Sequence, residues 1–156
     1  MPDSPDANMG WTFFGAIALP ILTCWYLKTA LLYLVAALIM AVIIASGDVL
    51  AAMPCLSSLT PIYIHFLVLG WLSQLIFGVA YWMFPKLPAG LNPVVYDRSA
   101  LASFFLLNVG LLLRAISEPL TTQVPMSGPA LAVSGFVQLA GAVCFVFSIW
   151  PRIRGK

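Results

Sequence analysis

Residues 61–85 read PIYIHFLVLGWLSQLIFGVAYWMFP, an apolar run that begins and ends with proline and contains no Asp, Glu, Lys or Arg. About 20 apolar residues are enough for a helix to cross a bilayer. Proline suits the first turn of a helix and cannot continue one at its end, so Pro61 and Pro85 fit the two boundaries. The run therefore predicts a transmembrane helix, with the chain's one histidine, His65, close to its start.

The composition of the whole chain agrees with this interpretation. Hydrophobic residues make up 62% of the 156 residues and charged residues only 8%, and the mean hydropathy is +1.03. A soluble domain would carry about 25% charged residues. The net charge of +2, without a dense basic run, gives no indication of nucleic-acid binding. We therefore expect an integral membrane protein whose main partner is the lipid bilayer.

Three further apolar runs predict three more spans, and together they define the fold class. We expect an all-α, integral membrane four-helix bundle within residues 22–150. Its helices are expected at about 22–45, 60–84, 98–118 and 129–150. Asp97 is a suitable N-cap for the third helix. Residues 1–21 are expected to form a polar N-terminus and an interfacial segment, and 151–156 a basic cytoplasmic tail.

The basic residues predict the orientation. If four helices alternate in direction, one side of the membrane receives Lys28, Lys86, Arg98, Arg152, Arg154 and Lys156. The loops on the other side, 47–58 and 121–128, contain no Lys or Arg. The positive-inside rule then places both termini in the cytoplasm. The expected location is the cytoplasmic (inner) membrane, crossed several times.

His65 is the first candidate site residue, because imidazole is the commonest protein ligand of transition metals and also binds haem iron. At helical spacing His65 shares a face with large aliphatic residues that include Leu69 and Leu72. A different face carries the small-residue stripe Gly70, Gln74 and Gly78, which is typical of close helix packing. His65, Leu69 and Leu72 are therefore predicted to contact a flat apolar cofactor. The open alternative is that His65 only donates a hydrogen bond to another helix.

Arg114 is the second candidate. It lies near the outward end of the third predicted helix, at a depth similar to that of His65 near the outward start of the second. A guanidinium at this level could bind a haem propionate through charge-assisted hydrogen bonds. The alternatives are that Arg114 extends to the membrane surface or pairs with Glu118 four residues later.

Other polar residues of the spans predict packing instead of chemistry. The fourth helix has small and polar residues near one face, namely Ser134, Gln138, Gly141 and Ser148. Such positions usually mediate helix packing and interhelical hydrogen bonds. The sequence contains no nucleophile-base arrangement and no phosphate-binding loop. Hydrolase chemistry is therefore not expected.

The segments WYLKTALLYLV (25–35) and HFLVLGWLSQLIFGVAYWMFP (65–85) resemble haem-copper oxidase subunit I, in particular the cbb-type oxidases and nitric oxide reductases, reduced to about four helices. In that family the second helix carries an axial histidine of the low-spin haem near the outer face. The resemblance implies that His65 is an axial ligand of haem b and that the protein transfers electrons as a membrane cytochrome b of a respiratory chain.

The single histidine departs from the family, whose catalytic subunits have several. This chain is therefore not expected to be a complete oxidase or nitric oxide reductase by itself. A second axial ligand could come from His65 of a second copy in a homodimer, from another subunit of a larger respiratory complex, or from Met40, Met83 or Met126. Two other interpretations stay open: a cofactor-free accessory or assembly subunit, and a handler of NO or copper.

Overall fold

The computed structural model describes residues 21–47, 59–84, 91–120 and 127–153, and the regular elements in these ranges are all helices. In chain order they are α2 (Ile21–Ala45), α4 (Leu59–His65), the π-helix η3 (Phe66–Ser73), α5 (Gln74–Met83), α6 (Pro93–Leu120), α7 (Ser127–Ile149) and the 3-10 turn η4 (Trp150–Ile153). α4, η3 and α5 follow one another without a break and form one rod. The predicted interfacial segment and the last three residues lie outside the described ranges.

The prediction of four spans is confirmed. Within the described residues, four helices are long and apolar enough to cross a membrane: Ile21–Ala45, Leu59–Met83, Pro93–Leu120 and Gly128–Ile153. Most of their large apolar side chains are exposed on the outside of the bundle. This is the pattern expected when the surrounding solvent is lipid, because hydrocarbon does not drive apolar side chains inward.

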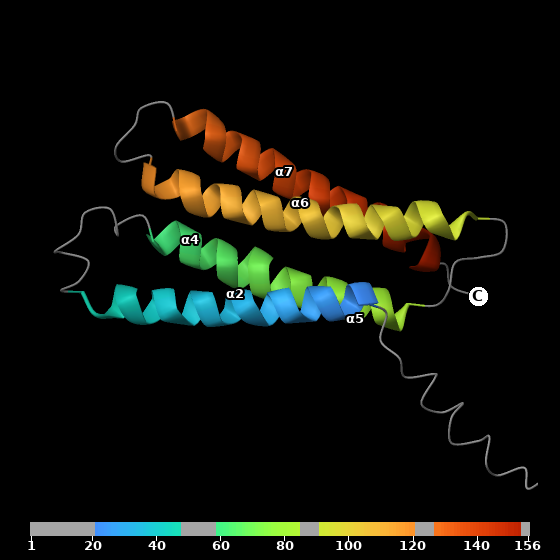
Figure 1. Ribbon diagram of the computed structural model, residues 1–156, viewed down its shortest axis with the longest axis horizontal. Helices are drawn as coiled ribbons and strands as arrows, with labels where there is room; N and C mark the ends of the chain where they lie inside the picture. Colours follow the sequence, from blue (N-terminus) through green and yellow to red (C-terminus); the bar gives the residue numbers. More distant parts are fainter. Residues whose placement is uncertain (1–20, 48–58, 85–90, 121–126, 154–156) are drawn as a thin grey trace, which may run out of the picture.

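The four helices form two antiparallel hairpins, which pack side by side in Figure 1. α2 pairs with the α4–η3–α5 rod, and α6 pairs with α7. α2 and α6 begin at one end of the bundle, where α5 and α7 finish; we call it the Asp97 end. α4 and α7 begin at the opposite end, which we call the His65 end.

The third helix begins earlier than predicted, at Pro93 and not at Arg98. The side chain of Asn92 accepts a hydrogen bond from the backbone N–H of Val94 at 3.1 Å, so Asn92 is the N-cap, and Pro93 follows in a first-turn position that needs no N–H. Asp97 is thus a helical residue. The prediction that it caps the helix was wrong because the Asn92-Pro93 pair supplies a better start.

Each half of the bundle has its own core. At the His65 end the buried residues Ala37, Ile62, Phe66 and Leu111 pack together. Toward the Asp97 end aromatic rings join the two hairpins: the rings of Phe77 and Phe145 stack with centroids 3.8 Å apart. Tyr26, which is fully buried, meets Phe104 edge-on at 5.1 Å. The hairpins are therefore held together by ring contacts toward the Asp97 end and by the packing of Leu111 with Ala37, Ile62 and Phe66 at the His65 end.

The predicted packing faces are confirmed. Ser134, Gln138, Gly141 and Ser148 are all buried. A Cβ atom built on Gly141 would lie 3.0 Å from the Leu107 side chain, and one on Gly110 would lie 2.6 Å from Cγ of Gln138. The α6–α7 pair therefore depends on glycine at positions where the two helices approach each other closely.

Candidate functional site

His65 is the last residue of α4, and the π-helix η3 starts at the next position. Its Nδ1 lies 2.9 Å from the carbonyl oxygen of Pro61, one turn earlier in the same helix. A carbonyl oxygen only accepts hydrogen bonds, so Nδ1 carries the proton and donates it. In the neutral form of the ring, the lone pair is then on Nε2. This is the arrangement that metal-binding histidines use, in which one nitrogen bonds a backbone carbonyl and the other is free to be the ligand.

The π-helix explains how the small-residue stripe stays on one face. Its members Gly70, Gln74 and Gly78 are buried, and the buried residues Ile62 and Phe66 continue the same four-residue step toward the start of the helix. In an α-helix each four-residue step overshoots a full turn by about 40°, so such a stripe would wind around the rod. The wider turns of η3 offset this drift, and the Ser73 hydroxyl donates to the carbonyl of Val68, five residues earlier, at 2.9 Å. The stripe was predicted to pack against a neighbour, and it does so on Tyr33 and Tyr26 of α2.

The same change of register separates the two aliphatic residues that were predicted beside His65. Leu69 packs against the aliphatic core at the His65 end, whereas Leu72 is 42% exposed on the bundle surface. Ile64 and Val68, next to His65 in the sequence or one turn away, are also exposed. The surface around the half-buried His65 is therefore aliphatic, but Leu69 forms part of the core beneath it.

Arg114 lies at the level of His65, as predicted. Leu111 and Ala115 of α6 belong to the same cluster as Ile62 and Phe66 of the second span. Arg114 lies between the first two residues in the sequence and His65 between the second two. Arg114 and His65 are therefore at about the same height in the bundle. The Arg114 guanidinium forms an ion pair with Glu118 at 3.4 Å, and both side chains are largely covered. This is one of the alternatives that the sequence left open. The face of α6 that Arg114 shares with Gly110 packs on α7, so any role toward a cofactor at His65 stays a prediction.

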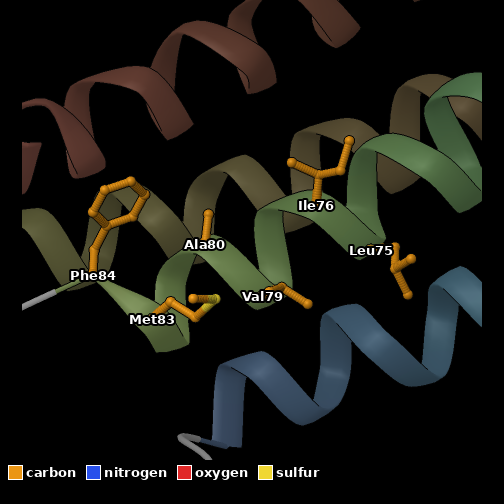
Figure 2. A pocket seen from close by; sticks show the side chains of 6 residues that line it. All are labelled: Leu75, Ile76, Val79, Ala80, Met83 and Phe84. Atoms are coloured by element: carbon orange, nitrogen blue, oxygen red, sulfur yellow. The ribbon is translucent and has the colours of Figure 1, made fainter.

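A groove runs along α5 in the other half of the rod. Figure 2 shows its lining side chains, with Leu75 directed toward α2. The lining residues are Leu75, Ile76, Val79, Ala80, Met83 and Phe84, and the groove has a volume of about 560 Å³. Neither His65 nor Arg114 belongs to it. A cofactor bound at His65 would therefore occupy a different surface.

Two polar clusters join the helices, and the sequence did not reveal either as a unit. In the first, the Thr29 hydroxyl donates to Oε1 of the buried Gln74 at 2.7 Å, and the Gln74 amide donates to Oδ1 of Asn108 at 3.4 Å. The cluster links α2, α5 and α6. Gln74 and Asn108 are polar residues in apolar runs, but only the rotation of each helix shows that they meet.

The second cluster lies at the Asp97 end. Oδ1 of Asp97 accepts hydrogen bonds from the Tyr81 hydroxyl at 2.7 Å and from Nη2 of Arg152 at 3.1 Å. The Arg152 guanidinium also lies 4.8 Å from the centre of the Tyr81 ring. The consecutive helices α5 and α6 are thus joined to the distant turn η4 at the Asp97 end.

The Gln74 cluster supports a stability prediction. Gln74→Leu keeps most of the side-chain volume and should lower the free energy of unfolding by about 1 kcal/mol, the usual range for interhelical hydrogen bonds in membranes. The loss should be modest because Thr29 can still donate to the Trp25 carbonyl at 2.8 Å and Asn108 to the Phe104 carbonyl at 2.7 Å. A double-mutant cycle with Asn108→Leu, measured by unfolding in mixed micelles, should show coupling. Strictly additive losses would contradict the cluster.

Comparison of the chain with protein-family models, with curated proteins and with solved structures gave no match.

Proposed function

We propose that the protein is a haem b-binding membrane protein of electron transfer, with His65 as one axial ligand and a second protomer or another subunit supplying the other. The observation that carries the proposal is the hydrogen bond from Nδ1 of His65 to the Pro61 carbonyl. It fixes the ring orientation and leaves Nε2 as the free ligand nitrogen. Haem b would supply a one-electron carrier at that nitrogen.

The position of Met83 removes one candidate for the second ligand. Met83 ends α5 at the Asp97 end, roughly 25 Å along the rod from His65, so it cannot share an iron with His65 of the same protomer. Met40 packs against the aliphatic core at the His65 end, whereas Met126 lies outside the described residues. A symmetric dimer would present His65 twice across one interface. The exposed aliphatic residues beside His65, Ile64 and Val68, suit burial against a haem plane or a second copy.

The setting we propose is the cytoplasmic membrane, with both termini in the cytoplasm, as the positive-inside rule predicts. The relation to haem-copper oxidase subunit I rests on the sequence resemblance around residues 25–35 and 65–85. The second candidate function, a cofactor-free accessory or assembly subunit of a respiratory complex, is supported by the same hydrogen bond. Nδ1 of His65 is satisfied within its own helix without any cofactor.

An absorption spectrum of the purified protein distinguishes these functions. We expect a Soret band and, after reduction, a sharp α-band that carbon monoxide does not alter, because two axial ligands leave no open position on the iron. A spectral shift with carbon monoxide would instead show an open position and favour a gas-binding role. The absence of a Soret band, even after purification from cells supplied with haem, would contradict the proposal and favour the cofactor-free subunit.

A further inference from the structure

A cavity opens between the two hairpins at the Asp97 end. It has a volume of about 310 Å³, and α2, α5 and α6 supply its walls. The lining residues are Ile21, Leu22, Trp25, Tyr81, Asp97 and Leu101. The cavity therefore combines an apolar floor, two aromatic side chains and one carboxylate.

The polar groups of this cavity are mainly acceptors. Both hydrogen bonds that Asp97 accepts end on Oδ1, and within the described residues Oδ2 accepts none. The Asp97 side chain is 54% exposed. The Tyr81 hydroxyl already donates its one proton to Oδ1. A ligand that complements this wall must donate hydrogen bonds, and the nearby rings favour a positive charge on it.

The position of the cavity indicates where such a ligand comes from. Asp97 lies in the second turn of α6, and Ile21 begins α2, so the cavity lies where the spans reach the membrane surface. This is the level of lipid headgroups, where tryptophan and tyrosine are enriched. The ion pair with Arg152 makes the site nearly neutral, which suits a zwitterionic headgroup better than an anionic one. Lys28, exposed one turn after Trp25 on α2, can extend toward the headgroup phosphate.

We propose that this cavity binds phosphatidylethanolamine, with the headgroup ammonium donating to Oδ2 of Asp97 beside Trp25 and Tyr81. The upper acyl chain lies on Leu101, one turn deeper in α6 than Asp97. The proposal is independent of haem binding, because the cavity and His65 lie at opposite ends of the bundle.

Lipid binding can be measured by native mass spectrometry of the full chain, exchanged into mixed micelles with equal amounts of phosphatidylethanolamine, its N-methylated form and phosphatidylcholine. Wild type should retain phosphatidylethanolamine about five-fold over phosphatidylcholine, the usual net effect of one hydrogen bond, with the N-methylated lipid between them. The N–H donors decrease along this series while the positive charge stays, so the order tests donation to Oδ2 on the unaltered protein.

Two variants separate lipid binding from the joining of the helices. Asp97→Asn should remove the preference. Arg152→Gln breaks the same interhelical ion pair but keeps the carboxylate, and it should retain the preference. Equal retention of the three lipids by wild type, or an equal loss of preference in both variants, would overturn the proposal.

Discussion

Replacing His65 with Asn should abolish the haem spectrum. The loss of a residue that only hydrogen-bonds to a metal ligand typically lowers metal affinity 10- to 100-fold, so the loss of the ligand itself should weaken haem binding by at least about 100-fold. Asparagine is the informative replacement. Its side-chain N–H can donate to the Pro61 carbonyl as Nδ1 of His65 does at 2.9 Å, but it has no counterpart of Nε2. The Soret absorbance per protein, with haem titrated into the detergent-purified variant, is the measurement.

The matched comparison for this variant is His65→Ala, which removes both the hydrogen bond and the ligand nitrogen. We expect both variants to lose the spectrum and only the alanine variant to lose thermal stability as well. If His65→Asn kept the Soret band, His65 would not be the axial ligand. If both variants kept the Soret band and only His65→Ala had a lower melting temperature, the role of His65 would be limited to its hydrogen bond to the Pro61 carbonyl.

Gly110→Val should lower the free energy of unfolding by about 2–3 kcal/mol, in the upper part of the range for overpacking a well-packed interface. A Cβ atom at Gly110 would lie 2.6 Å from Cγ of Gln138 and 3.2 Å from two backbone atoms of α7, the nitrogen of Gln138 and the carbonyl oxygen of Ser134. The Gln138 side chain can rotate away, but the backbone atoms can move only if α7 itself shifts. Unfolding in mixed micelles, followed by circular dichroism, measures the loss.

Gly135→Val provides the control on the other helix of the same pair. A Cβ atom there meets nothing within 4 Å, and the intrinsic helix preference of the substitution is the same at both positions. The difference between the two variants therefore reports the close approach of α6 and α7. Equal stability of the two variants would show that the helices do not pack through Gly110.

The sequence predicted the candidate site only in outline. It identified His65 and its level in the bundle, because a single histidine in an apolar run is conspicuous and helical rise gives its depth. It did not predict the partner of Nδ1, since any carbonyl or hydroxyl on a neighbouring helix was an equal candidate until the structure showed Pro61. The prediction that Leu69 and Leu72 share one surface assumed an unbroken 3.6-residue period, which η3 interrupts.

The sequence by itself determined the four helices of the described residues that are long and apolar enough to cross a membrane, because the hydropathy and the flanking prolines of each segment are read without reference to the other segments. It also determined which stripe of the second span packs, since only small residues allow close approach. The tertiary structure decided the rest: the π-helix, the Arg114–Glu118 pair, and the joining of Tyr81, Asp97 and Arg152. The joining of Tyr81, Asp97 and Arg152 depends on the rotation and register of each helix against its neighbours. Contacts of a few ångströms fix that rotation and register, and a hydropathy pattern carries no information about them.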